Sequence, residues 1–100
     1  MIRCNTNCSV VTITWVWFPE DVLDKLWEKH ELEQWEVEEA IFDDPAAAPV
    51  WDDDPVHGRR VILYGKTAGG RSLFVALKPL DLDAGWWKCK TAYQEEDEDD

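Results

Sequence analysis

The chain has 100 residues, of which 45% are hydrophobic and 12% aromatic, and it carries a formal net charge of −12. This length accommodates one compact domain and excludes a second hydrophobic core, while the seven tryptophans exclude a chain that stays disordered. The excess of acids excludes a surface that attracts nucleic acid on every side. We expect one domain over residues 1–93 and a low-complexity acidic tail over residues 94–100 that buries nothing.

The sequence favours a cytoplasmic protein that does not enter the membrane. A bilayer-spanning helix needs about 18–20 consecutive apolar residues, and the most apolar run, residues 10–18, is shorter and contains two threonines. A single cation precedes that run, and no signal-peptidase site of small residues follows it. The three cysteines are too few for a disulfide framework, which fits a reducing compartment; they are Cys4, Cys8 and Cys89.

Charge is distributed unevenly along the chain. Residues 1–18 carry +1, and residues 19–54 carry −12 because 14 acids there face only two lysines. Residues 55–93 carry +5 from seven bases and two acids, and the tail adds −6. Such an asymmetry concerns the partners of a protein rather than its fold. It places a cationic half of the sequence beside an anionic half.

The first half of the chain predicts one strand and two helices. Residues 10–17 combine β-branched and aromatic residues with interleaved threonines, which is typical of a strand. Pro19 ends that strand and opens a helix over residues 19–30, whose apolar positions recur at helical spacing and continue to His30. A second, shorter helix is expected over residues 34–42, and an Asp-Asp-Pro sequence ends it.

The second half predicts a sheet. Residues 46–57 are expected to form a loop with at most one short extended piece, because prolines interrupt this region. Residues 60–66 and 71–78 are apolar runs joined by a glycine-bearing connection, as in an antiparallel hairpin. A third run, residues 85–93, alternates between two faces. One face holds Trp87, Cys89, Thr91 and Tyr93, and the other holds Trp86, Lys88 and Lys90.

The order of these elements predicts an α+β fold in which two N-terminal helices pack on a three- to four-stranded antiparallel sheet. The helices cover one face of the sheet, which leaves the other face free for binding. Seven tryptophans are more than a core of this size encloses. We therefore expect an exposed aromatic patch and, with it, a homodimer or a complex with another protein.

Three separated segments of the chain resemble one known family. They are Lys29-His30 at the end of the first helix, EEAIFDDP at residues 38–45 and LYGKTAGGRSLFV at residues 63–75. In order and spacing they are similar to the BrnT toxins of type II toxin–antitoxin systems and their relatives with a RelE-like fold, and the resemblance covers residues 12–92. It implies a small ribonuclease that arrests translation and is neutralised by a DNA-binding antitoxin, BrnA.

The end of the chain departs from this family. Where the family has a Thr-Ala-Arg or Ser-Ala-Arg motif and then a basic helix, this chain has Thr91-Ala92 followed by Tyr93, Gln94 and six acids. The missing arginine is one of the cations that the resemblance implies near the scissile phosphate, and an acidic tail repels RNA. The resemblance therefore implies either an active ribonuclease or a weakened descendant of one.

Metal-independent RNA cleavage needs a base, an acid and cations around the phosphate. His30 matches the family motif and is of the residue type suited to proton transfer near neutral pH; alternatively it caps the first helix or packs in the core against Leu26. The other catalytic candidates are Arg71, Lys88, Lys90 and Tyr93. The candidate RNA-binding residues are Arg59, Arg60, Lys66 and Trp86. The alternative for these cations is an ordinary solvated surface, and for the tryptophan a place in the core or an interface.

No cofactor or metal site is expected. Residues 52–54 with His57 place three carboxylates near an imidazole, but adjacent loop carboxylates point in different directions and lack the glycine-spaced ligands of a calcium loop. Cys4 and Cys8 lack the second ligand pair of a structural zinc site. The paired glycines of the hairpin lie between strands rather than before a helix, so they form no phosphate-binding loop.

Two functions from different classes remain open. In the first, the domain is a BrnT-like ribonuclease or its weakened descendant and binds RNA on the cationic face. In the second, it is a non-enzymatic interaction protein, such as a phage-borne inhibitor, whose anionic helices and tail imitate the charge of nucleic acid. The family motifs favour the first function, and the net charge, the missing arginine and the acidic tail favour the second.

Overall fold

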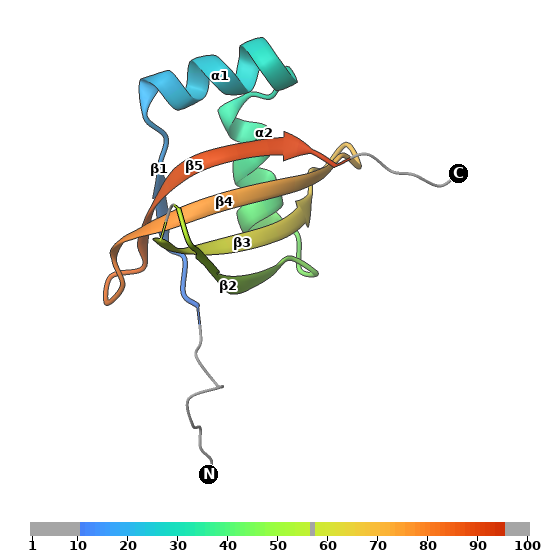
Figure 1. Cartoon of the computed structure of the whole chain (residues 1–100). Coiled ribbons are helices and arrows are strands. Elements are labelled where there is room, and N and C mark those ends of the chain that lie inside the picture. Colours follow the sequence, from blue (N-terminus) through green and yellow to red (C-terminus); the bar gives the residue numbers. More distant parts are fainter. Residues whose placement is uncertain (1–10, 57, 96–100) are drawn as a thin grey trace.

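A computed structural model describes residues 11–56 and 58–95 of the chain. They form an α+β domain with helices and a five-stranded mixed sheet (Figure 1). The helical segments are α1 Glu20–His30, α2 Gln34–Glu38 and the π-helical turn η2 Glu39–Asp43, which continues α2. The strands are β1 Trp15–Trp17, β2 Ala48–Asp54, β3 Gly58–Lys66, β4 Ser72–Asp81 and β5 Trp86–Gln94. Cys4, Cys8, His57 and the expected tail from residue 96 onward lie outside the described residues.

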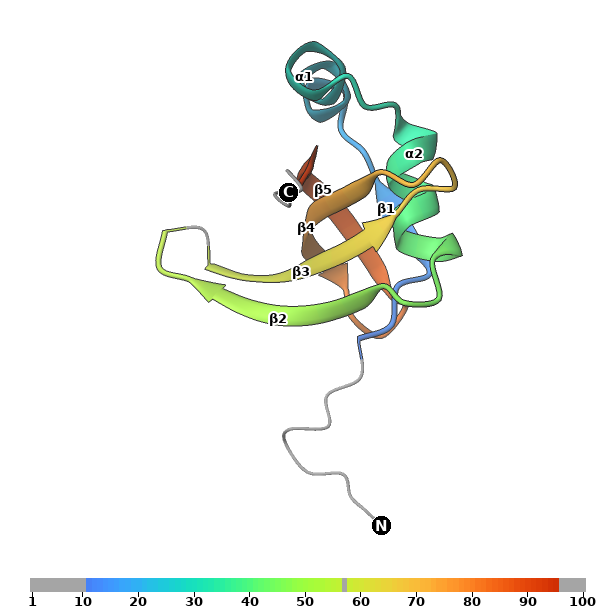
Figure 2. The same ribbon diagram turned by 90° about the vertical axis from the view of Figure 1, so that its right-hand side faces the viewer.

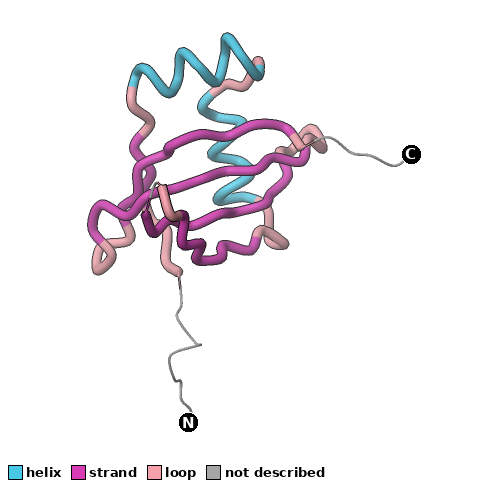
Figure 3. The backbone as a smooth tube through the Cα atoms, in the orientation of Figure 1, coloured by secondary structure: helices cyan, strands magenta, loops and turns pink. Residues whose placement is uncertain are grey.

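The sheet has the strand order β1-β5-β4-β3-β2 and separates two faces. α2 and η2 lie against one face, called here the inner face, and α1 lies along the β5 side of the sheet (Figures 1 and 3). Within residues 11–56 and 58–95, no helix lies on the opposite, outer face. In Figure 2 the turn of the β2–β3 hairpin projects away from α2, so the sheet bends toward its outer face.

α1 forms where the sequence predicts the first helix. Pro19 precedes its first turn, two acids stand at its positive end, and Leu26 turns into the core. The helix ends at Glu31, whose backbone is left-handed with φ 53°, so that the amide of Leu32 donates to the carbonyl of Leu26. His30 is therefore the last helical residue and stands immediately before a sharp turn of the chain.

α2 and η2 form one continuous helical segment that covers the predicted helix over residues 34–42. At its start, the backbone amide of Glu33 donates to Oε1 of Glu36 at 3.0 Å, as in a capping box. Further along, Ala40 of η2 packs directly on Gly65 of β3. A Cβ atom at Gly65 would overlap the carbonyl oxygen of Ala40, so this close approach of helix and sheet requires glycine.

The sheet is larger than the predicted three- to four-stranded antiparallel one, and it is mixed. Of the expected first strand, residue 10 lies outside the described residues and only Trp15–Trp17 pairs. β1 runs parallel to β5, with Val16 opposite Trp87. The segment before it is held there as well, because the indole nitrogen of Trp87 donates to the carbonyl of Thr12 at 2.9 Å. Local periodicity does not reveal a parallel pairing between the two ends of a chain.

The expected loop over residues 46–57 contains a full strand, β2, so this prediction was wrong. β2 pairs antiparallel with β3 alone and forms an edge of the sheet. Proline has no backbone N–H and cannot donate a hydrogen bond to a neighbouring strand. An edge strand such as β2 tolerates Pro49, because one of its sides has no neighbouring strand to bond to. Pro45, just before this region, and Pro55 both stand outside the strand. The prediction failed because it counted prolines without regard to their position.

β5 contains a β-bulge that reverses part of the expected alternation. In the pairing with β4 the register skips Lys90. The predicted alternation is therefore right as far as Cys89, which is buried, and wrong beyond it. Ala92 is buried in place of Thr91, and Tyr93 lies on the outer face. β5 also extends to Gln94, and the amide of the next residue bonds to β4, so the domain is slightly longer than predicted.

The hydrophobic core lies between the inner face of the sheet and the helices. Trp87 is its largest fully buried side chain, and Leu26, Leu32, Leu63 and Leu77 pack in the same cluster. Its contributors from β3, β4 and β5 alternate with outward-facing residues, as a sheet covered on one side requires. Among the described helices, none combines the length and the apolar character needed to cross a membrane.

Candidate functional site

The outer face carries a row of four aromatic rings, called here the aromatic row. Tyr64 of β3, Phe74 of β4 and Tyr93 of β5 stand opposite one another in the strand register. The rings of Tyr64 and Phe74 meet edge to face at a centroid distance of 5.6 Å, and Phe74 stacks on Tyr93 at 4.7 Å. His30, at the end of α1, continues the row at 5.8 Å from Tyr93. Four separate elements thus contribute one ring each.

His30 and Tyr93 are the polar pair at the α1 end of this row. His30 is half-buried and Tyr93 is 38% exposed, so solvent and a ligand can reach both rings. An imidazole can accept or donate a proton near neutral pH, and a phenol can donate one. Of the alternatives for His30, packing in the core is wrong, because the side chain is only half-buried and its ring lies beside that of Tyr93, tilted by 41°.

Next along β5, cations surround a pocket of about 200 Å³ on the outer face. Its lining consists of Arg60, Lys78, Lys90 and Thr91. Nε of Arg60 lies 3.0 Å from Oδ2 of Asp52, and Nη2 of Arg60 lies 3.3 Å from Oδ2 of Asp54. These two carboxylates offset part of the positive charge of the pocket, which weakens its attraction for a phosphate group.

The other end of β5 carries three exposed tryptophans, called here the tryptophan cluster: Trp15, Trp17 and Trp86. Each is between 45% and 49% exposed. Trp15 and Trp86 meet edge to face at 5.7 Å and line a pocket of about 390 Å³. Nζ of Lys88 lies 5.5 Å from the ring centroid of Trp17, within the range of a cation–π interaction. A flat apolar ligand and an anion can therefore be bound side by side here.

Arg71 is used for structure rather than held open for a phosphate. Its Nη1 donates to both carboxylate oxygens of Glu36, at 3.0 and 3.2 Å, and its Nε donates to Oε1 of Gln94 at 3.1 Å. The same guanidinium reaches the carbonyls of His30 and Glu31 at 3.5 and 3.4 Å. It therefore ties the end of α1 and the start of α2 to β5, and it holds His30 in place.

Arg59 lies on the inner side of the β2–β3 hairpin, away from the pocket that contains Arg60. Its guanidinium carbon stands 4.3 Å over the ring of Trp51, and its Nε lies 3.7 Å from Asp53. The ring of Trp51 in turn lies 5.7 Å from that of the buried Trp87. Successive residues of a strand point to opposite faces, so Arg59 and Arg60 cannot both serve the outer face.

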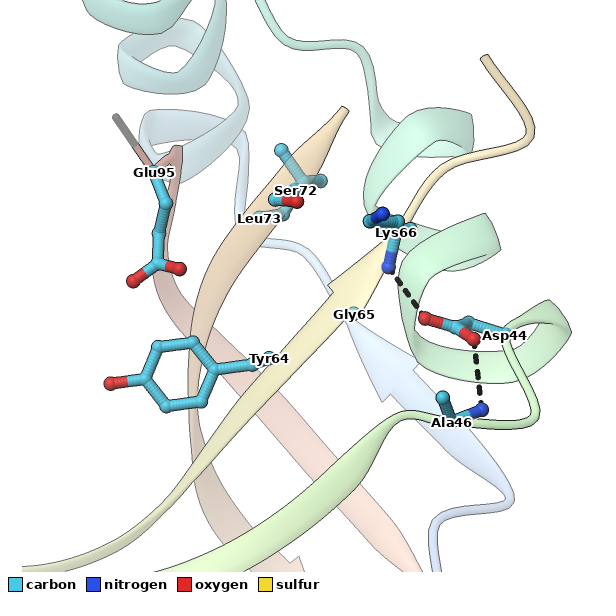
Figure 4. A pocket seen from close by; sticks show the side chains of 8 residues that line it. All are labelled: Asp44, Ala46, Tyr64, Gly65, Lys66, Ser72, Leu73 and Glu95. Atoms are coloured by element: carbon cyan, nitrogen blue, oxygen red, sulfur yellow. Dashed lines mark hydrogen bonds between the residues drawn. The ribbon is translucent and has the colours of Figure 1, made fainter. Parts of the chain in front are cut away.

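Lys66 lines a further pocket of about 300 Å³ at the Tyr64 end of the aromatic row (Figure 4). The carboxylate of Asp44 accepts hydrogen bonds from the amides of Ala46 and Lys66, each 2.8 Å long. These two bonds hold the pKa of Asp44 below its ordinary value of 3.8. In Figure 4, Tyr64 and Glu95 stand on the other side of β3 from Asp44. Asp44 is therefore a structural carboxylate and not a proton donor.

Metal and thiol chemistry gain no support from the described part of the chain. No three His, Cys, Asp or Glu side chains within it come together as a metal-binding group. The carboxylates of Asp52 and Asp54 both pair with the guanidinium of Arg60, and that of Asp53 lies 3.7 Å from Nε of Arg59. Burial raises the pKa of Cys89 to about 12, so this thiol stays protonated and is no nucleophile.

The structure gathers seven of the nine predicted site residues on or beside the outer face, and it separates Arg59 and Arg71 from them. The seven are His30, Arg60, Lys66, Trp86, Lys88, Lys90 and Tyr93. Sequence reasoning missed Tyr64, Phe74, Lys78 and the two tryptophans of β1. The alternation within the hairpin runs marks the first three as outward-facing, but only the strand register shows which of them meet.

Comparison with known proteins identifies no relative. No protein-family model matches the chain, and no curated protein and no solved structure matches it either. The geometry of the outer face is therefore the basis for assigning a function.

Proposed function

We propose that the chain binds RNA on the outer face of its sheet and cleaves it at the His30–Tyr93 pair, as a BrnT-like ribonuclease with a RelE-like fold or a weakened descendant of one. The observation that carries the proposal is the packing of these two proton-transferring rings, 5.8 Å apart, on the face that also carries Lys88 and Lys90. The sequence motifs around residues 29–30 and 63–75, which resemble those of the BrnT family, also support this proposal.

The reaction needs no group beyond the chain and the RNA. His30 accepts the proton of a 2′-hydroxyl, whose oxygen attacks the adjacent phosphorus and forms a 2′,3′-cyclic phosphate. The bond to the 5′-oxygen breaks, and Tyr93 donates its phenolic proton to that leaving oxygen. Lys90, which lies nearer to Tyr93 on β5 than Lys88 does, reduces the negative charge that develops on the phosphate, and Lys88 binds the RNA further along the strand. Proton exchange with water then restores both side chains.

We expect a low rate of RNA cleavage, because no arginine of the site is available to bind the phosphate. Arg71 is engaged by Glu36 and by backbone carbonyls, and the sequence has no arginine after Ala92. Lysines therefore supply the positive charge for the phosphate, and a lysine lacks the two-pronged hydrogen bonding of an arginine. This supports a weakened enzyme rather than one with the full rate of the family.

The test is cleavage of a single-stranded RNA at low salt in the presence of a metal chelator. His30→Ala is expected to lower the rate by about 10²–10⁴-fold, as for the loss of a general acid or base, and Tyr93→Phe is expected to act similarly while keeping the ring stack. The control is Lys29→Ala, an exposed neighbour of His30 on α1. A chain ending at residue 95 should cleave faster, because five acids are removed.

Two results contradict the proposal. One is cleavage that persists unchanged in both His30→Ala and Tyr93→Phe, which would indicate a contaminating nuclease or another site. The other is a lack of cleavage by both the full chain and the chain ending at residue 95.

A second function, binding of a basic protein partner by the helices, is favoured by a separate observation. Residues 20–43 carry ten acids and two lysines, and seven of the ten acids are exposed. Such a surface suits a cognate antitoxin or another protein with a basic site. Titration with a polylysine peptide tests it: Asp24→Asn with Glu28→Gln should weaken binding, whereas the same titration should be unaffected by Tyr93→Phe.

A further inference from the structure

The outer face offers two separate surfaces on which flat rings can stack. The aromatic row contributes Tyr93, which is 38% exposed, and Tyr64, which is 50% exposed. The tryptophan cluster contributes Trp86 and Trp15, which are 46% and 49% exposed. Proteins that bind single strands commonly stack nucleobases on half-exposed indole or phenol rings of a sheet, because every base has a flat face that can stack on a ring.

The two platforms lie at opposite ends of the same strand. Trp86 and Tyr93 stand seven positions apart on the outer face of β5, which corresponds to roughly 20 Å at about 3.3 Å per residue. Lys88 and Lys90 lie between them, and the β-bulge brings Lys90 to the pocket on the outer face. The strand therefore presents ring, cation, cation and ring in sequence.

Charge on this face is opposite in sign to that of the whole chain. The outward-facing cations are Arg60, Lys66, Lys78, Lys88 and Lys90, and the outward-facing acids are Asp52, Asp54, Asp81 and Glu95. Five cations and four acids give +1, in a chain of −12. Lys88 and Lys90 supply the positive charge along β5 itself, so a phosphate backbone is attracted to this strand.

We infer that β5 is a binding track for single-stranded RNA, with one base stacked on Tyr93 and another on Trp86 and with the intervening phosphates on Lys88 and Lys90. The span corresponds to about four nucleotides, the lower end of the range for single-strand sites on β-sheet proteins. This inference rests on the proposed function only in taking RNA as the ligand. It adds that the protein binds single-stranded RNA in preference to a duplex. A duplex is excluded because its bases are stacked inside and cannot reach either platform.

The experiment measures binding without cleavage. The probe is an eight-nucleotide 2′-O-methyl RNA, which lacks the attacking hydroxyl, and its affinity for the full chain is measured at low salt by fluorescence anisotropy beside that of an eight-base-pair RNA duplex. Trp86→Ala and Tyr93→Ala are each expected to weaken binding of the single strand by about 5- to 150-fold, the usual effect of removing one stacked base. The double variant should show the product of the two factors, because the sites are far apart.

The controls separate stacking from folding and from general aromatic exposure. Trp86→Phe and Tyr93→Phe keep a ring and should keep most of the affinity. Trp27→Ala and Trp35→Ala remove indoles that are 55% and 56% exposed but stand on α1 and α2, and they should leave binding unchanged.

Tyr93→Phe also distinguishes this inference from the proposed function. It should lower the rate of cleavage of unmodified RNA by about 10²–10⁴-fold and retain binding of the methylated strand. If the full chain binds the methylated strand through both rings but cleaves no RNA, the binding track stands and the ribonuclease assignment falls.

Three results would overturn the inference. One is equal affinity for the duplex and the single strand, another is a loss in Trp27→Ala as large as that in Trp86→Ala, and the third is an absence of binding at low salt. If, instead, Trp86→Ala and Tyr93→Ala abolish self-association in light scattering and leave RNA binding unchanged, the face belongs to a second copy of the chain.

Discussion

Gly65 is the residue on which the packing of η2 against the sheet depends. It stands in β3 directly below the backbone of Ala40, and the neighbouring strand residues place Leu63 in the core and Tyr64 on the aromatic row. The absence of a Cβ atom at Gly65 therefore allows the helix layer to pack on β3, the strand that also carries Tyr64 on the outer face.

Gly65→Ala should destabilise the fold, because the added methyl group overlaps a backbone carbonyl that cannot rotate away. We expect the free energy of unfolding to fall by about 1–3 kcal/mol, the usual cost of overpacking, as measured by urea denaturation. Gly69→Ala is the matched control, since a Cβ there would stand 3.8 Å from Oγ1 of Thr67. Equal stability of the two variants would show that η2 does not approach β3 closely.

Asp44 links stability to pH. Its pKa is lowered by hydrogen bonds from two backbone amides, so the folded protein binds the proton of this group less readily than the unfolded chain does. The contribution of Asp44 is therefore fully present above the ordinary pKa of 3.8 and is lost as the pH falls through the lower, folded value.

Asp44→Asn should be less stable than the parent chain at pH 7, and the difference should shrink as the pH falls below 3.8. The measurement is thermal unfolding at a series of pH values. Asp43→Asn, at an exposed neighbour, is the control and should leave the pH profile unchanged. A difference between Asp44→Asn and the parent that stays constant from pH 7 to pH 2.5 would contradict the role assigned to the carboxylate.

At the scale of elements, the loop between α1 and α2 is held by the buried side chain of Leu32 and by Arg71, which precedes β4 and bonds to both ends of the loop. Its guanidinium is 28% exposed and its partner Glu36 13% exposed, so the ion pair is only partly screened by water. Because the same guanidinium contacts the carbonyl of His30, it also sets the position of that ring beside Tyr93.

Arg71→Ala should lower the free energy of unfolding by about 1.5–3 kcal/mol, the usual range for hydrogen bonds to a charged group. Arg71→Lys should recover only part of this loss, since an ammonium group cannot bridge Glu36, Gln94 and two carbonyls at once. Both values come from chemical denaturation. A large loss of RNA cleavage in Arg71→Lys at unchanged stability would instead make Arg71 a phosphate ligand.

At the scale of the whole molecule, acids and cations are concentrated on different surfaces, and most of the indole rings are exposed. Residues 20–44, which form the helices and their connections, carry 11 of the 17 acids in the described residues, and the outer face of the sheet carries five of the nine described cations. Of the seven tryptophans, Trp87 is buried and Trp51 half-buried, and the other five are between 45% and 56% exposed. The expectation of more indoles than the core can enclose is confirmed.

Self-association through these indoles is expected to make fluorescence quenching depend on concentration. In dilute solution, acrylamide should quench most of the tryptophan emission, and the quenched fraction should fall as a homodimer forms and shields exposed rings. Light scattering over the same concentrations checks the mass. A constant quenched fraction together with a constant monomer mass would exclude a dimer that uses these rings.

The α+β class, both helices and the β3–β4 hairpin followed from the sequence by itself, because they depend on residue types at short spacing: an apolar stripe, capping residues and glycine in a turn. The same reasoning found His30, Tyr93 and the lysines of β5 as candidates. Only the tertiary structure decided which candidates share a site. The parallel pairing of β1, the bulge at Lys90 and the engagement of Arg71 depend on residues distant in the chain, and packing between layers sets them. A one-residue change of register moves a side chain to the other face, which is why the aromatic row became visible only in the folded chain.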